Sequence, residues 1–172
     1  MESSGSRLTI QAERGPNMVT AKTHGRSVHV DAPVEVVFAH VRDPLNFMAA
    51  DPQPVRIDKL ALTPEGVGST WESRWHVAGV PMHAVWTREQ CVPCERIVDH
   101  STTGMVWTYT TAPDAAGTTL TLSYAISTRL AAANWVLDHV FGDQDHQLDL
   151  MLAHFKAAIE ASVGSAAGGD RG

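Results

Sequence analysis

The sequence predicts an α+β domain in which a twisted antiparallel sheet wraps around one long C-terminal helix. Apolar and polar residues alternate from residue 55 to about 129, with turn residues between the segments, as expected for a meander of strands. Beyond that point Leu148, Leu152, Phe155 and Ile159 recur at helical spacing. A strand ending at Val30 and two brief helical segments precede the meander, so about seven strands are expected in all.

The two short helices are expected directly after the first strand. Asp31 has the side chain of a helix N-cap, and Pro33 follows in the position that favours a first helical turn. Asp43 and Pro44 interrupt the helical pattern before a second short segment at residues 45–50. This region is therefore predicted to contain two helices rather than one.

The composition limits the class of protein. The chain has 172 residues, 44% of them hydrophobic, which suits a single domain. Its net charge of -6 argues against binding to nucleic acids or anionic membranes. No apolar run reaches the length of a membrane span or of a signal-peptide core, so a cytoplasmic protein without integral membrane association is expected.

The two ends of the chain are polar and rich in small residues. Residues 1–16 and 164–172 bury too little to offset the entropy of ordering them, so flexible segments are expected there. The ligand-binding domain is expected to span residues 17–163.

Three turns predict how neighbouring strands pair. Two-residue loops are expected at Gly79-Val80 and Val92-Pro93, and a symmetric loop at residues 113–117. The expected partners are Trp75 with Ala84, Ser73 with Trp86, Trp71 with Arg88, Trp86 with Asp99, Arg88 with Ile97, Glu89 with Arg96, Trp107 with Leu122, and Tyr109 with Leu120. In this register the aromatic residues of the three hairpins share one face of the sheet.

That face and the C-terminal helix are predicted to enclose an apolar pocket. Its expected ligand-binding residues are Trp71, Ser73, Trp75, Met82, Trp86, Arg88, Ser101, Trp107, Leu148, Leu152 and Phe155. Aromatic walls offer a large contact area, and sparse polar groups fix the orientation of a ligand. A filled core is the alternative, but four tryptophans on one face exceed what packing needs, which favours a pocket.

Three residues of this face are candidates for proton transfer. Asp99 is expected beside Trp86, where its carboxyl group should either find a hydrogen-bond partner or have its pKa raised by burial, which would suit it to acid–base catalysis. Tyr109 and Tyr124 are the other catalytic candidates. A register shifted by one residue would instead place Asp99 on the solvent side. Arg88 is expected either at the pocket mouth, as an anion contact, or in solvent.

No metal site is expected. His76 and His83 would face each other across the first hairpin, but the sequence offers no third ligand there. His139, Asp143 and His146 share one face of the last helix and are interpreted as a solvated polar face.

No cofactor site is expected either. Cys91 and Cys94 have the spacing of a redox motif but lie at a predicted strand turn, not at a helix N-terminus that would stabilise a thiolate. Neither a glycine-rich phosphate loop nor a Gly-x-Ser-x-Gly elbow occurs.

Four segments, in the same order, resemble motifs of the START-like, or SRPBCC, superfamily. Residues 28–38 resemble its opening, in which Ala-Pro begins the first helix, and residues 43–47 its Asp-Pro-x-x-Phe second helix. Residues 66–69 and 93–98 resemble its Gly-x-Gly-Ser strand entry and its proline hairpin. The resemblance covers residues 24–163. It implies a helix-grip fold with a cavity between sheet and last helix, in the polyketide cyclase/dehydrase and lipid-transport group.

Three functions are compatible with this interpretation. The first is a carrier that sequesters a small hydrophobic molecule, which could be aromatic, polyketide-like or lipid-like. The second is a cofactor-independent cyclase, aromatase or dehydratase; in such enzymes a pocket arginine typically follows the Gly-Val-Pro turn, where this chain has Met82. The third is a protein-interaction module. A monomer and a homodimer are both compatible with the sequence.

Overall fold

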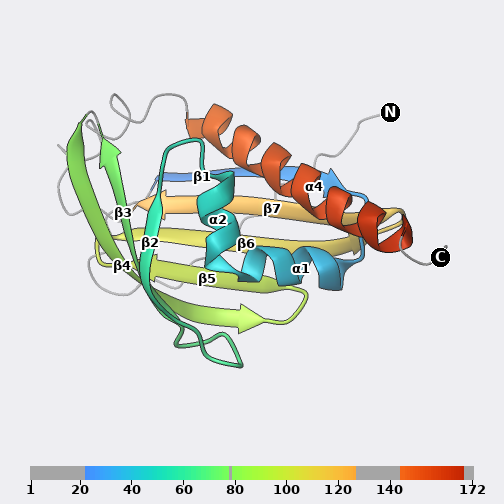
Figure 1. Ribbon diagram of the computed structural model, residues 1–172, viewed down its shortest axis with the longest axis horizontal. Helices are drawn as coiled ribbons and strands as arrows, with labels where there is room; N and C mark the ends of the chain where they lie inside the picture. Colours follow the sequence, from blue (N-terminus) through green and yellow to red (C-terminus); the bar gives the residue numbers. More distant parts are fainter. Residues whose placement is uncertain (1–21, 78, 127–143, 169–172) are drawn as a thin grey trace, which may run out of the picture.

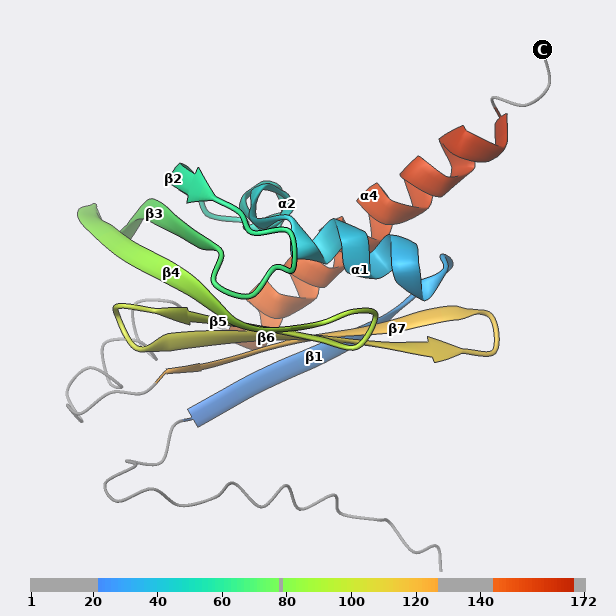
Figure 2. The same cartoon turned by 90° about the horizontal axis from the view of Figure 1, so that it is seen from below.

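The computed structural model describes residues 22–77, 79–126 and 144–168 (Figure 1). Within these ranges, one antiparallel sheet carries the helices on one of its faces (Figure 2). The strands are β1 (Lys22–Val30), β2 (Arg56–Ala61), β3 (Thr70–Val77), β4 (Val80–Val92), β5 (Arg96–Ser101), β6 (Met105–Asp114) and β7 (Gly117–Ile126). The helices are α1 (Val34–Arg42), α2 (Pro44–Ala50) and α4 (Gln144–Gly168).

The sheet order is β1-β7-β6-β5-β4-β3-β2, so β1 is the one strand not placed beside its neighbour in sequence. Strands β2 to β4 curl toward the helices, while α4 crosses β1 and β7 and contacts α1 and α2 (Figures 1 and 2). The predicted α+β helix-grip architecture is confirmed, with seven strands, two short helices after β1 and a long terminal helix.

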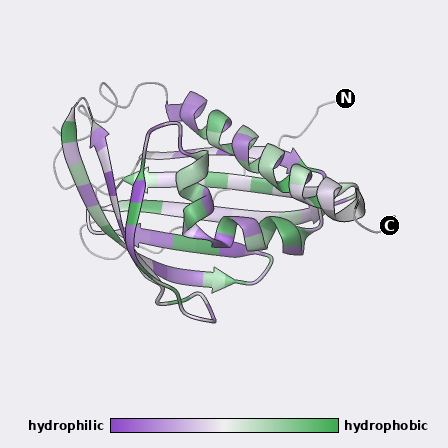
Figure 3. Ribbon diagram, in the orientation of Figure 1, coloured by the Kyte–Doolittle hydropathy of each residue, from purple (hydrophilic) through white to green (hydrophobic). Residues whose placement is uncertain are grey.

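Alternating burial explains why these segments form strands. Every second residue of β7 from Thr118 to Tyr124 is buried, and β6 alternates in the same way from Trp107 to Thr111. Figure 3 shows green, apolar positions separated by paler ones along β7. The buried residues meet the stripe Leu148, Met151, Leu152, Phe155 and Ile159 of α4, so sheet and helix form one core. Helix α4 continues to Gly168, beyond residue 163.

The start of α1 differs from the prediction. The residue at its N-cap is Pro33, which makes no side-chain cap, and Asp31 instead bonds His29 through its carboxylate and Glu160 through its backbone N–H. The expected N-cap role of Asp31 is therefore wrong. At α2 the Asp43 carboxylate does accept a hydrogen bond from the backbone N–H of Leu45, at 2.9 Å.

Two hairpins keep the predicted faces but shift their pairs by two residues. Val77 pairs with Val80, which makes Trp71 the partner of Trp86 instead of Arg88. Gly79 takes a φ of 83° in this turn, a left-handed conformation that favours glycine. The remaining observed pairs are Ser73 with Ala84, Trp75 with Met82, Trp107 with Tyr124, and Tyr109 with Leu122. Because side chains alternate with a period of two, an even shift leaves each one on its predicted face.

The register of the hairpin between β4 and β5 differs from the prediction at two points, the turn and a bulge. Val92 pairs with Arg96 across a three-residue turn, so the pairs next to the turn differ from the expected ones by three residues. A bulge between Arg88 and Gln90 then reduces this difference to two residues. Arg88 therefore lies opposite Asp99, not Ile97.

Two other pairs expected across this hairpin are also wrong. Trp86 lies opposite Ser101 instead of Asp99. The predicted Glu89–Arg96 pair does not form, and Glu89 lies 3.2 Å from the His100 imidazole.

Candidate functional site

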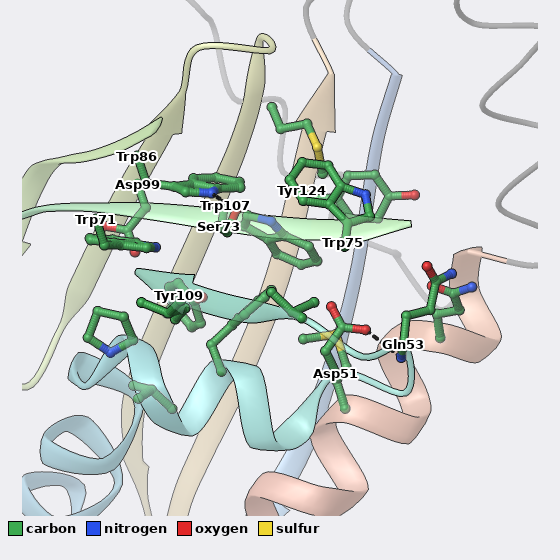
Figure 4. Close-up of a pocket in the computed structure, with 18 of the residues that line it drawn as sticks. Asp51, Gln53, Trp71, Ser73, Trp75, Trp86, Asp99, Trp107, Tyr109 and Tyr124 are labelled. Atoms are coloured by element: carbon green, nitrogen blue, oxygen red, sulfur yellow. Dashed lines mark hydrogen bonds between the residues drawn. The ribbon is translucent and has the colours of Figure 1, made fainter. Parts of the chain in front are cut away.

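A cavity lies between the inner face of the sheet, α2 and the first turns of α4 (Figure 4). Its atom-free space is about 1020 Å³, including solvent at its mouth. Seven aromatic side chains line it: Phe47, Trp71, Trp75, Trp86, Trp107, Tyr109 and Tyr124. Such a wall suits apolar, flat or polycyclic molecules, which gain contact area against aromatic faces.

Most of the residues assigned to the site from the sequence line this cavity. They are Trp71, Ser73, Trp75, Trp86, Arg88, Asp99, Trp107, Tyr109, Tyr124 and Leu148. Four others lie elsewhere. Leu152 and Phe155 are buried in the core further along α4, while Met82 lines a surface groove on β3 and β4. Ser101 is outside the lining, where its hydroxyl accepts a hydrogen bond from the backbone N–H of Met105, at 3.0 Å.

Stacked indoles form the wall beside β3 and β4. The rings of Trp71 and Trp86 are nearly parallel, with centroids 6.3 Å apart, and the Arg88 guanidinium carbon lies 5.4 Å from the Trp71 ring. The Trp86 indole N–H donates a hydrogen bond to the Ser73 hydroxyl at 2.7 Å. The Trp86 indole N–H is thus satisfied within the wall, and apolar ring surface faces the cavity.

A second aromatic cluster joins α2, β6 and β7. The Trp107 ring packs edge-on against Phe47 and at a tilt against Tyr124, with centroids 5.1 and 5.0 Å apart. Tyr124 also stacks on His24 of β1 and donates a hydrogen bond from its hydroxyl to the Gln144 side chain. Tyr124 thereby connects the sheet to the beginning of α4.

Arg88 and Asp99 form a buried ion pair. The guanidinium Nε and Nη2 donate to the two carboxylate oxygens at 2.7 and 3.0 Å, and each side chain is 2% exposed. A third hydrogen bond runs from Arg88 to the carbonyl of Arg42 at 2.7 Å. Arg88 is therefore not a solvated side chain; it lines the cavity with its charge paired to Asp99.

Opposing effects act on the pKa values of this pair. Burial raises the pKa of the Asp99 carboxyl, and the hydrogen bonds from Arg88 oppose that rise. Burial lowers the pKa of the Arg88 guanidinium, but its bonds to Asp99 outweigh burial and leave that pKa raised. The bidentate contact is that of an ionised pair, so both oxygens of Asp99 are already engaged.

Asp51, which the sequence analysis did not single out, lines the cavity at the end of α2 (Figure 4). One carboxylate oxygen accepts a hydrogen bond from the backbone N–H of Gln53 at 2.8 Å. Burial raises the pKa of this carboxyl to about 6. A usable signal was its place between the apolar end of a helix and Pro52, where the chain turns back toward β2.

Tyr109 supplies a second polar group inside the cavity. Burial raises the pKa of its phenol well above the ordinary value, and the negative charge of Asp99 raises it further. Its hydroxyl makes no hydrogen bond to the parts of the chain that the structure describes. Tyr109 is therefore a neutral hydrogen-bond donor that faces the cavity.

The histidines and cysteines do not form a metal centre within residues 22–77, 79–126 and 144–168. His76 lies opposite Pro81, and His83 contacts Glu72 at 3.2 Å, so the expected facing pair of histidines is wrong. Cys91 and Cys94 are free thiols. His139 and Asp143 lie outside the described residues.

None of the helices in the described ranges is long and apolar enough to cross a membrane.

The sheet, the helix it grips and the aromatic cavity define a START-like, or SRPBCC, fold. The family of polyketide cyclase/dehydrase and lipid transport proteins matches residues 23–160, and the chain belongs to it. Membership implies a pocket for a hydrophobic ligand. No curated protein matches the chain significantly.

Three solved structures illustrate the shared fold. The di-domain ARO/CYC StfQ from the steffimycin biosynthetic pathway is 14% identical with a TM-score of 0.66; the match covers 84% of this chain and 52% of StfQ. Protein CV1439 from Chromobacterium violaceum is 21% identical with a TM-score of 0.54, over 81% and 98% of the two chains. The Polyketide_cyc-like protein Cgl2372 from Corynebacterium glutamicum is 18% identical with a TM-score of 0.53, over 86% and 97%.

Proposed function

We propose that this protein binds a small hydrophobic molecule in the cavity and carries or sequesters it. The observation that supports this proposal is the set of seven aromatic side chains that line the cavity, with the Trp86 N–H bonded to Ser73 and the charge of Arg88 paired with Asp99. A wall of this kind favours burial of an apolar ligand, because aromatic ring faces offer it a large apolar contact area.

Replacing Ile57 with phenylalanine is expected to reduce binding by at least about tenfold, since the larger ring would occupy cavity space. Ile57 lines the cavity from β2, and the exposed Leu60 on the same strand provides the control change Leu60→Phe. The neutral dye N-phenyl-naphthylamine, which becomes fluorescent in apolar surroundings, provides the titration.

The expected result is saturable binding by the wild type and Leu60→Phe, with weak binding by Ile57→Phe. Equal affinity in all three proteins, with thermal unfolding showing each to be folded, would place the dye outside the cavity and contradict the proposal.

A cofactor-independent cyclase, aromatase or dehydratase is the second candidate. The observation that favours it is the Asp51 carboxyl, whose pKa of about 6 suits proton transfer near neutral pH, in the same cavity as the neutral donor Tyr109. Turnover of a polyketide-like compound that Asp51→Asn abolishes while leaving binding within a few-fold would favour the enzyme over the carrier.

A further inference from the structure

The charged groups that line the cavity do not cancel. Among its described lining residues they are Arg88, Asp99 and Asp51. The first two neutralise each other through the bidentate pair at 2.7 and 3.0 Å. The carboxylate of Asp51 has no cationic side chain within salt-bridge distance in the described part of the chain. The described lining of the cavity therefore carries one uncompensated negative charge when Asp51 is ionised.

Asp51 also has unused hydrogen-bonding capacity. One of its oxygens accepts the backbone N–H of Gln53, and no described residue donates to the other. An ionised carboxylate is an acceptor only and gains most from a charged or hydroxyl donor. Burial in an apolar cavity makes that need stronger, because water there is scarce.

We infer that the ligand is a largely apolar molecule with one polar end that donates a hydrogen bond to Asp51. A protonated amine is the best donor and a hydroxyl the next. Hydrophobic carboxylates are excluded. This inference rests on the proposed ligand binding in the cavity. A carboxylate would be repelled by Asp51, and Arg88 offers it little net attraction because its charge is already paired with Asp99. The aromatic rings of the wall favour a cation further, since their faces attract positive charge.

The test uses one apolar scaffold with three polar ends: the ethylamine, ethanol and acetate derivatives of naphthalene, with naphthalene itself as the reference. Calorimetric or fluorescence titration at pH 7 is expected to rank the amine first and the acetate last, with at least about a tenfold difference between them. Asp51→Asn keeps the shape but removes the charge, and is expected to bring the amine and the acetate within about threefold of each other. Asp58→Asn, a carboxylate on β2 outside the cavity lining, is the matched control and should keep the wild-type ranking.

An acetate that binds as tightly as the amine, or a ranking that survives Asp51→Asn, would overturn the inference while leaving the proposed function intact. Absence of binding by naphthalene and all three derivatives would instead contradict the proposed function, and the inference with it. The Asn variant is expected to fold, because its side-chain oxygen can still accept the Gln53 N–H.

Discussion

Replacing Arg88 with methionine is expected to lower the free energy of unfolding by about 3–5 kcal/mol, because it leaves the Asp99 carboxylate buried without its partner. Both side chains are 2% exposed, and Arg88 also holds the carbonyl of Arg42 at the end of α1. Asp99→Asn is expected to be destabilising for the same reason. A raised pKa of Asp99 alone would predict stabilisation, but the loss of a partner for a buried guanidinium has the larger effect.

Chemical denaturation of Arg88→Met, of Asp99→Leu and of the double variant Arg88→Met/Asp99→Leu measures this effect. The double variant removes both charges and is expected to recover most of the stability that either single change loses, because no unpaired charge then remains buried. Additive losses, or a single Arg88→Met variant as stable as the wild type, would show that the pair is not the buried contact described above.

Asp51→Asn is expected to stabilise the protein at pH 7 by roughly 2 to 3 kcal/mol. The folded-state pKa of this carboxyl is raised from 3.8 to about 6 by burial, so the ionised form is disfavoured in the folded protein. The folded state holds its proton to higher pH than the unfolded chain does. Stability from this residue is therefore greatest below pH 4, falls between pH 4 and 6, and stays low above pH 6.

Thermal or denaturant unfolding of wild type and Asp51→Asn between pH 4 and 8 measures this difference. The two proteins should be about equally stable at pH 4, diverge as the pH rises from 4 to 6, and keep a nearly constant difference above pH 6, because asparagine does not ionise. A difference in stability that is the same at every pH would indicate that ionisation of Asp51 is not its cause. A stabilising substitution at a binding residue would fit the usual trade between stability and function.

The fold was predictable from the sequence because hydropathy alternation depends only on which face a residue occupies. The hairpins at Gly79 and at residues 113–117 were each shifted by two, and this even shift left Trp71, Trp75 and Trp107 on the inner face. In the β4–β5 hairpin the turn and the bulge changed the register in opposite directions, so Asp99 kept its face but changed its partner.

The polar groups of the site were harder to predict. The Arg88–Asp99 contact depends on the bulge between Arg88 and Gln90, which no residue type in β4 signals. The position of Asp51 depends on how α2 packs over the sheet, a tertiary contact that local patterns do not encode. Asp99 and Tyr109 were named as acid–base candidates from their face alone. Of these two, Asp99 is engaged in the ion pair with Arg88, whereas the Tyr109 hydroxyl has no hydrogen-bond partner among the described residues.

The most direct test of the cavity as a binding site uses methyl-labelled methionine and NMR. Met105 and Met151 line the cavity, and Met82 lies in the surface groove on β3 and β4, so one spectrum contains both probe and control. During titration with the naphthalene ethylamine derivative, the methyl signals of Met105 and Met151 are predicted to shift saturably and to show contacts with the ligand's ring protons, while Met82 stays unchanged. Saturable shifts at Met82, with Met105 and Met151 unmoved, would contradict the account.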